Sequence, residues 1–237
     1  MDYSFVIPVY NEEKIIAESV DKLYDFLRKT KKAFEIIIAN DGSNDKTLEI
    51  AMKKSRQYKE VKIISNEQNR GRGSVLTKGF KMIKGRFGFY IDSDLSIDLS
   101  LFYCFIKELD SGADIVIGSK HLIDSEVEYS FVRRLVSRGY STLAQRLFKI
   151  PIKDYQCGFK AFRKSVLDDV LNSVKNQGWF WDTEILIRSH LNGWKIREIP
   201  ALVKESSERI SKVRLISDIL SMFFSMVKFK LEIKKKL

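Results

Sequence analysis

Two aspartates one residue apart, Asp92 and Asp94, come directly after the apolar run at residues 87–91. Carboxylates at the end of a strand supply the hard oxygen ligands that Mg²⁺ and Mn²⁺ take, and these ions usually share their coordination with substrate phosphates. The pair therefore predicts a site for a metal-bridged diphosphate. By itself, the same pattern is also typical of a helix N-cap or a solvated turn, so the interpretation depends on the rest of the chain.

Apolar runs alternate with helical patterns through the first half of the chain, and strands are predicted at residues 3–9, 34–39, 61–65, 87–91 and 114–118. This alternation predicts an α/β fold with a mostly parallel sheet flanked by helices. Ligands of such sheets bind beyond the carboxyl ends of the strands. Asn11-Glu12, Asp41 and Asp92-x-Asp94 all follow strand ends, so we expect them to meet at one edge.

A glycine-rich turn, Asn69-Arg70-Gly71-Arg72-Gly73, precedes the third predicted helix. It lacks the third glycine of a dinucleotide-binding G-x-G-x-x-G, and the chain has no G-K-[S/T] of a P-loop. We interpret Gly71 as easing the entry into a helix. Arg70 and Arg72 are candidates for contacts with phosphate.

The composition indicates one domain with a C-terminal extension, since 44% of the 237 residues are hydrophobic and only three are proline. The two cysteines form no metal-ligand pattern. The chain opens on a strand pattern instead of a signal peptide, and no window reaches the ~18 apolar residues of a membrane span. The net charge of +11 implies a polyanionic partner: nucleic acid, an anionic membrane or phosphorylated substrates. No nucleic-acid-binding motif is present, so we expect no nucleic acid partner.

Four segments occur together in a characteristic order: residues 6–13 (VIPVYNEE), Asn40-Asp41-Gly42-Ser43, Asn69-x-Gly71-x-Gly73 and Asp92-x-Asp94. With these segments the chain resembles family 2, the large inverting family of GT-A glycosyltransferases. Residues 154–162 (DYQCGFKAF) resemble the signature of the dolichyl-phosphate β-glucosyltransferases, whereas the mannosyl-transferring relatives usually carry Ser-Gly-Phe-Arg at residues 157–160. Trp181-Asp182-Thr183-Glu184 and Ile210-Ser211-Lys212-Val213 also resemble the polyprenyl-phosphate branch.

The resemblance implies a GT-A (Rossmann-like) fold and roles for the residues in these motifs. The nucleotide-sugar donor would be bound by Pro8, Tyr10, Glu12, Asp41, Arg70 and Asp92, and Mg²⁺ or Mn²⁺ by Asp92 and Asp94. Some relatives carry a metal-binding glutamine where this chain has Ser96, which leaves the third protein ligand open. Lys120 replaces a frequent arginine and keeps its charge without the bidentate fork.

The implied reaction is the inverting transfer of a hexose, most directly glucose from UDP-glucose, to a dolichyl or polyprenyl phosphate. The alternatives are a GDP-mannose-dependent enzyme of the same branch and a family 2 transferase with a non-lipid glycan acceptor. The catalytic candidates are Asp92, Asp94, Asp154 and Asp182. Asp154 would orient the acceptor phosphate or a sugar hydroxyl, with a structural N-cap as the alternative, and Asp182 would face the sugar or the phosphate clamp. The acceptor phosphate would be clamped by residues from the set Lys120, Arg133, Arg134, Arg138, Arg209 and Lys212, for which a solvated helix face is the alternative.

Two segments, residues 131–148 and 215–237, carry apolar stripes at a helical period, and the second ends in three lysines. Amphipathic helices of this kind lie in membrane interfaces, and basic residues add attraction to anionic lipid; packing on the protein's own domain is the alternative. We predict a transferase domain over residues 1–212, with a donor half (1–120) and an acceptor half (121–212), followed by an amphipathic basic helix at 213–237. We expect a cytoplasmic protein peripherally associated with the cytoplasmic face of a membrane, and leave its oligomeric state open.

Overall fold

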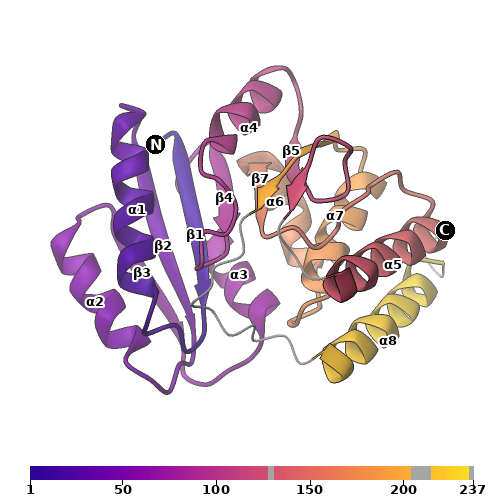
Figure 1. Ribbon diagram of the computed structural model, residues 1–237, viewed down its shortest axis with the longest axis horizontal. Coiled ribbons are helices and arrows are strands. Elements are labelled where there is room, and N and C mark those ends of the chain that lie inside the picture. The colour runs from indigo at the N-terminus through magenta and orange to yellow at the C-terminus, as the bar shows by residue number, and fades with distance from the viewer. Residues whose placement is uncertain (128–130, 204–214, 235–237) are drawn as a thin grey trace.

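A seven-stranded sheet with the order β3-β2-β1-β4-β7-β5-β8 forms the centre of the computed structural model, which describes residues 1–127, 131–203 and 215–234 (Figure 1). The strands of this sheet are β1 (Tyr3–Val9), β2 (Phe34–Asp41), β3 (Val61–Asn66), β4 (Phe87–Ile91), β5 (Ile115–Ser119), β7 (Phe159–Arg163) and β8 (Ile196–Pro200). A second, two-stranded sheet pairs β6 (Glu126–Val127) with β9 (Leu202–Val203).

The helices connect the strands and cover the sheet. They are α1 (Ile16–Lys29), α2 (Thr47–Gln57), α3 (Arg72–Phe80), α4 (Leu101–Asp110), α5 (Phe131–Phe148), α6 (Lys164–Val170), α7 (Trp181–Leu191) and α8 (Leu215–Lys234), with a 3₁₀ turn η1 at Leu171–Ser173. Phe5 of β1 contacts Phe102 of α4 on one face of the sheet. Tyr90 of β4 contacts Trp181 of α7 on the other. The core therefore has two layers, as expected when helices cover both faces of a largely parallel sheet.

Every strand pairing is parallel except those of β7, which runs antiparallel to both β4 and β5. The predicted mostly parallel α/β sheet is confirmed. β7 was not predicted, and its direction matters for the site. Because Ile91 at the end of β4 pairs with Phe159 at the start of β7, residues 157–158 lie beside Asp92. The antiparallel strand thus brings the motif at residues 154–162 to the edge of the sheet where β4 ends.

The predicted strands agree closely with the structure because their side chains are buried. All eight residues of β2 are buried, as expected of a central strand that reads as a continuous apolar run. The bounds of β1 and β4 match those predicted. The third helix ends at Phe80.

Helix α8 packs beside α5 at one end of the molecule (Figure 1). Its Phe229 contacts the rings of Phe148 and Phe180, and Met226 and Ile233 are buried with it. The buried side of α8 is therefore not the predicted apolar stripe, whose residues Ile219, Leu220, Phe223, Phe224, Val227 and Leu231 are exposed. The domain boundary predicted between residues 212 and 213 lies outside the described residues. None of the described helices combines the length and the apolarity that crossing a membrane requires.

Candidate active site at the carboxyl edge of the sheet

Asp92 lies directly beyond the end of β4 and against the start of β7. Its N–H donates to the carbonyl of Gly158 (3.0 Å), and a Cβ at Gly158 would overlap Oδ2 of Asp92. Only glycine lets the two segments approach this closely. Leu95 adopts a left-handed backbone (φ 46°) and donates its N–H to the carbonyl of Asp92 (3.0 Å). A non-glycine residue in this region is uncommon, so the loop after β4 is held in a specific, tight shape.

Asp94 lies two residues further along the same loop and is half-buried. Its Oδ1 accepts the N–H of Ser96 (3.2 Å), the residue that stands where some relatives carry glutamine. Within the described residues, no group of three or more His, Cys, Asp or Glu side chains surrounds a common point. Two carboxylates with the remaining positions left to phosphates and water suit Mg²⁺, which binds proteins in this way. The donor set of Asp92 and Asp94 therefore fits a metal that arrives with a diphosphate.

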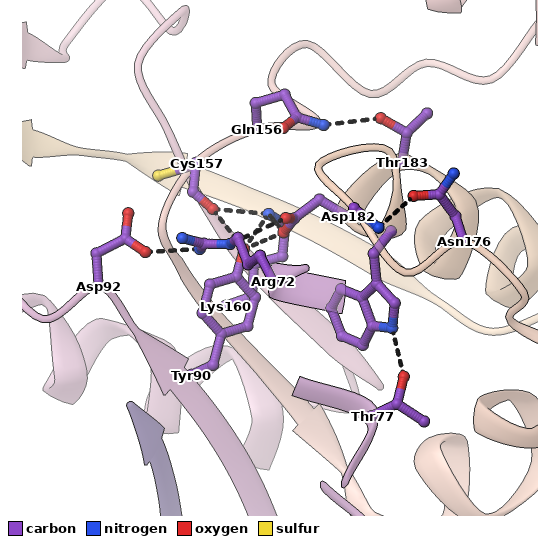
Figure 2. Close-up of polar contacts among 12 residues, drawn as sticks. Arg72, Thr77, Tyr90, Asp92, Gln156, Cys157, Lys160, Asn176, Asp182 and Thr183 are labelled. Atoms are coloured by element: carbon purple, nitrogen blue, oxygen red, sulfur yellow. Dashed lines mark hydrogen bonds and ion pairs between the residues drawn. The ribbon is translucent and has the colours of Figure 1, made fainter. Parts of the chain in front are cut away.

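Beside Asp92 lies a buried group of charged side chains, Arg72, Lys160 and Asp182 (Figure 2). Nη2 of Arg72 lies 2.6 Å from Oδ1 of Asp92, and its Nε lies 3.7 Å from Oδ2 of Asp182. Lys160 donates to Oδ1 of Asp182 (2.7 Å) and to the hydroxyl of Tyr90 (2.8 Å), and that hydroxyl also donates to Asp182. Two acids and two bases are thereby balanced, as buried charges must be to offset their lost hydration.

The electrostatics of this group follow from burial and pairing. Burial, the largest single effect, would lower the pKa of Arg72, but the charges of Asp92, Tyr90 and Asp182 together outweigh it, and the pKa lies above its ordinary value. Burial, followed by the charge of Asp182, holds the pKa of Tyr90 well above its ordinary value. Arg72 is therefore a permanent cation and Tyr90 a permanent neutral hydroxyl in the working range of pH.

Asp41, one of the predicted donor-binding residues, lies at the end of β2. Its carboxylate accepts the N–H groups of Arg70 (3.0 Å) and Gly71 (2.8 Å) and the amide of Asn66 (2.8 Å). Gly71 caps α3 with φ 102°, which agrees with its interpretation as the entry to a helix. Asp41 is almost fully buried and thus fixes the glycine-rich turn.

The other predicted donor residues surround the same edge. Glu12 is buried, and its N–H donates to Oγ1 of Thr47 (2.8 Å). Pro8 and Tyr10 are half-buried, and Arg70 is exposed. Asn11, next to Glu12, has φ 53°, a conformation that asparagine tolerates better than most residues. The ends of β1, β2 and β4 therefore carry the predicted donor residues at one edge of the sheet.

Asp154 and Lys120, both predicted to act on the acceptor, contact each other. Asp154 is fully buried and accepts the N–H groups of Lys120 (2.9 Å) and Gln156 (3.0 Å), while Nζ of Lys120 lies 3.7 Å from it. Burial, the largest single effect, would raise the pKa of Asp154, yet the charges of Lys120, His121 and Lys160 and the N–H of Lys120 together hold the pKa below its ordinary value. This position favours a role in holding the loop over contact with a substrate, so the predicted catalytic role of Asp154 stays a prediction.

The remaining predicted phosphate-binding residues come mostly from α5. Arg134 donates to the carbonyl of Val127 (2.9 Å), and Arg138 is exposed. The side chain of Arg133, and Arg209 and Lys212 altogether, lie outside the described residues. Tyr90 and Lys160 complete the buried group around Asp182, and no role was predicted for either. Lys160 lies inside the quoted motif at residues 154–162, whereas no sequence signal distinguishes Tyr90 from the other aromatic residues of the strands.

Known proteins resemble this chain in sequence over most of its length. The profile described as Glycosyl transferase family 2 matches residues 4–171. The chain is 32% identical over 227 residues to the glycosyltransferase AglD of Haloferax volcanii, covering 94% of this chain and 36% of that protein. It is 32% identical to the dolichyl-phosphate beta-glucosyltransferase of Saccharomyces cerevisiae, covering 83% and 65%, and 31% identical to the dolichol-phosphate mannosyltransferase of Pyrococcus furiosus, covering 99% and 66%. The chain thus spans between about a third and two thirds of these relatives' length.

Solved structures share the fold. The glucosyl-3-phosphoglycerate synthase of Mycobacterium tuberculosis, in complex with Mn²⁺, UDP-glucose and phosphoglyceric acid, superposes with a TM-score of 0.72 at 18% identity, covering 97% of this chain and 79% of that one. Staphylococcus aureus TarS in complex with UDP-GlcNAc gives 0.58 at 22% identity, covering 95% and 65%. The fold is therefore that of GT-A glycosyltransferases. With the profile covering most of its length and relatives above 30% identity, the chain belongs to glycosyl transferase family 2.

Proposed function

We propose that this protein transfers a hexose from a nucleoside diphosphate sugar to the phosphate of a dolichyl or polyprenyl lipid, with UDP-glucose as the donor. The signature at residues 154–162 and the dolichyl-phosphate beta-glucosyltransferase relatives support this donor. The P. furiosus mannosyltransferase, which aligns with 99% of the chain, supports the second candidate, transfer from GDP-mannose.

The contacts of Asp182 carry the proposal. Its carboxylate is buried, accepts hydrogen bonds from Lys160 and Tyr90 and faces Arg72, so its oxygens point at groups of the protein itself instead of at an incoming hydroxyl. Asp182 is therefore poorly placed to act as a general base. A neutral hydroxyl acceptor needs such a base, whereas a phosphate monoester is already ionised near neutral pH. The arrangement favours an acceptor that brings its own anionic oxygen.

The other residues would then bind and orient the two phosphate-bearing substrates. On the donor side, Pro8, Tyr10, Glu12, Asp41 and Arg70 would hold the nucleotide, and Asp92 and Asp94 the divalent ion. When bound, Mg²⁺ or Mn²⁺ supplies Lewis-acid stabilisation to the departing nucleoside diphosphate. Because the reaction gathers two anionic groups, positioning and charge neutralisation are the main tasks of the protein.

On the acceptor side, Lys120, Arg134 and Arg138 would meet the lipid phosphate, joined by Arg133, Arg209 and Lys212. The outer side of α8 would rest on an anionic membrane at its cytoplasmic face, where the acceptor lipid lies. Its exposed apolar residues are Ile219, Leu220, Phe223, Phe224, Val227 and Leu231, and the segment ends in a run of lysines. Apolar contact and basic charge together suit such a surface.

The direct test incubates the protein with Mg²⁺, UDP-glucose or GDP-mannose, and a short polyprenyl phosphate, followed by mass spectrometry of the lipid. Glucosyl phosphoprenol is the expected product, and mannosyl phosphoprenol would select the second candidate. The matched control replaces the acceptor by the same prenol without its phosphate, which should give no product. Transfer to the free prenol or to a soluble glycan would contradict the proposed acceptor.

A further inference from the structure

The buried ammonium of Lys160 is bonded in a way that its sequence position does not explain. Lys160 lies on β7 with 0% of its surface exposed. It donates to the carbonyl of Cys157 (2.6 Å), to the hydroxyl of Tyr90 (2.8 Å) and to Oδ1 of Asp182 (2.7 Å). A lysine ammonium has three donors, and all three have partners. Burying a charge costs much stabilisation even when it is paired, so Lys160 calls for an explanation beyond packing.

Arg72 is confined in a similar way, and it links Asp182 to Asp92. Its guanidinium lies 2.6 Å from Asp92 on one side and 3.7 Å from Asp182 on the other. The guanidinium carbon also lies 5.2 Å from the ring centre of Tyr90 and 5.3 Å from that of Trp179, within the range of cation–π attraction. Two carboxylates and two rings thus hold Arg72 in one place.

Asp92 is in turn held from two directions. Arg72 lies at its Oδ1, and the backbone of residue 158 approaches the carboxylate so closely that a Cβ there would overlap Oδ2. We propose that Lys160, Asp182 and Arg72 form a positioning chain that holds the carboxylate of Asp92 in one orientation toward the metal and the diphosphate. This inference rests on the proposed function, and it assigns Lys160 and Arg72 as positioning residues.

The chain joins the two halves of the protein. Asp92 follows β4, and Arg72 begins α3, both in the donor half; Asp182 lies on α7 and Lys160 on β7, in the acceptor half. Removing the ammonium of Lys160 would leave Asp182, among the described residues, with Arg72 as its cationic partner. Because unlike charges attract more strongly at low dielectric, Arg72 would shift toward Asp182 and release Asp92. Metal-dependent binding of the nucleotide should therefore depend on a residue that touches neither the metal nor the nucleotide.

The experiment measures, by calorimetry, the dissociation constants of UDP and of GDP in EDTA and in Mn²⁺. Their ratio reports the gain in affinity that the metal provides. In Lys160→Met and Arg72→Lys this ratio should fall by about tenfold, the usual size of a change in the groups that orient a metal ligand. In EDTA, the dissociation constants of the variants should lie within about twofold of those of the wild-type protein. The residues proposed to hold the nucleotide, at the ends of β1 and β2, are unchanged in these variants.

Two further variants separate positioning from general stability. Lys160→Arg keeps the charge, and arginine is the residue of the related mannosyl-transferring signature, so this variant should keep the ratio of the wild-type protein. Arg163→Met removes a different cation from the same strand, one that pairs with Asp114 at 3.3 Å, and should also keep it. If Lys160→Met does not fold, Arg72→Lys and Lys160→Arg carry the test. In the double variant Lys160→Met/Arg72→Lys the losses should be less than additive, since both break one chain.

Three results would overturn the positioning chain. The first is an unchanged ratio in both Lys160→Met and Arg72→Lys. The second is an equal loss of affinity in EDTA and in Mn²⁺ for Arg72→Lys, which would make Arg72 a direct phosphate ligand. The third is a matching loss in Arg163→Met, which would indicate general destabilisation of β7. By contrast, failure of the wild-type protein to bind either nucleotide with Mn²⁺ would refute the proposed function itself.

Discussion

Asp92 and Asp94 are neighbours in sequence, but their surroundings differ. Asp92 contacts Arg72 and the backbone of Gly158, whereas Asp94 is half-buried and accepts the N–H of Ser96. Substituting Asp92 disturbs its buried ion pair with Arg72, and substituting Asp94 disturbs mainly the predicted metal site. The two residues should therefore separate catalysis from stability.

Asp94→Ala should reduce transfer by about 100-fold or more, since a metal contributes several kcal/mol to the transition state and each 1.36 kcal/mol is tenfold in rate. Its free energy of unfolding should change by no more than about 0.5 kcal/mol. Asp92→Ala should lose similar activity and also about 1–3 kcal/mol of stability, because Arg72 would lose its closest partner. Rate assays and urea denaturation measure both. Near-native turnover of Asp94→Ala at saturating metal would refute the assignment of the metal site.

Asp41 is predicted to contact the base of the nucleotide, and its carboxylate accepts the N–H groups of residues 70 and 71. Both roles act on the ground state and the transition state alike. Asp41→Ala should therefore raise the KM for the donor more than it lowers kcat. Steady-state kinetics with varied donor and fixed acceptor test this. A donor KM equal to that of the wild-type protein would count against both roles.

Asp154 provides a prediction for pH. Its pKa in the folded protein lies below its ordinary value, so its ionised form stabilises the fold above about pH 4, and this contribution is lost as pH falls through the lower, folded pKa. Asp154→Asn should lower the free energy of unfolding by about 3 kcal/mol near neutral pH, as for a broken buried pair. The difference from the wild-type protein should shrink below about pH 4. Urea denaturation between acidic and neutral pH measures it, and a constant difference would contradict the assigned ionisation.

At the scale of elements, sequence patterns predicted the strands of the first half, most of which read as apolar runs, and missed β7 and β8, which carry charged residues. β1, β2 and β4 are almost entirely buried and read as apolar runs. β8 is an edge strand with a mixed pattern of exposure, and β7 contains the charged Lys160 and Arg163. Their pairing is set by contacts between distant segments, which a local pattern cannot report.

The same reason limits what the sequence could say about the site. The carboxylates after the strands were predictable, because parallel strands end at one edge. The partners of Asp92 and Asp182 were not, since Lys160 meets Asp182 through the placement of β7 beside β4, and Arg72 reaches both carboxylates from the start of α3. Lys160 also violates the expectation that lysine avoids the core. Such violations tend to occur at functional sites.

The junction of β4 and β7 can be tested at Gly158. An alanine there would overlap the carboxylate of Asp92, so Gly158→Ala should displace that carboxylate and lower kcat by about 100-fold, the effect of a misplacement of about 1 Å. Gly178→Ala is the matched control, since an added Cβ would meet only Oδ1 of Asn176, at 3.6 Å. It should keep kcat and melting temperature. Equal activity in the two variants would show that the close approach at Gly158 has no role in the reaction.

At the scale of the whole molecule, α8 has two apolar sides. Met226, Phe229 and Ile233 face inward and are buried, and Glu232 pairs with Arg188 (3.3 Å) and Lys175 (2.9 Å). Truncating the chain within α8 would therefore disturb the core together with any membrane contact. The outward side is the better target, because Leu220, Phe224 and Leu231 are 51%, 67% and 59% exposed.

Replacing Leu220, Phe224 and Leu231 by glutamine should weaken sedimentation with anionic vesicles and slow transfer to long polyprenyl phosphates in them, because apolar contact with the membrane is lost. Transfer to a short, water-soluble acceptor should be unchanged, since no core residue is altered. High salt should weaken vesicle binding of the wild-type protein through its lysines, as exposed charges are screened within ~8 Å at physiological ionic strength. The control replaces Met82 and Leu191, which are exposed elsewhere, and should bind vesicles normally. Full vesicle binding by the triple variant would refute the membrane surface of α8, and a change from dimer to monomer would assign that surface to a second copy of the chain.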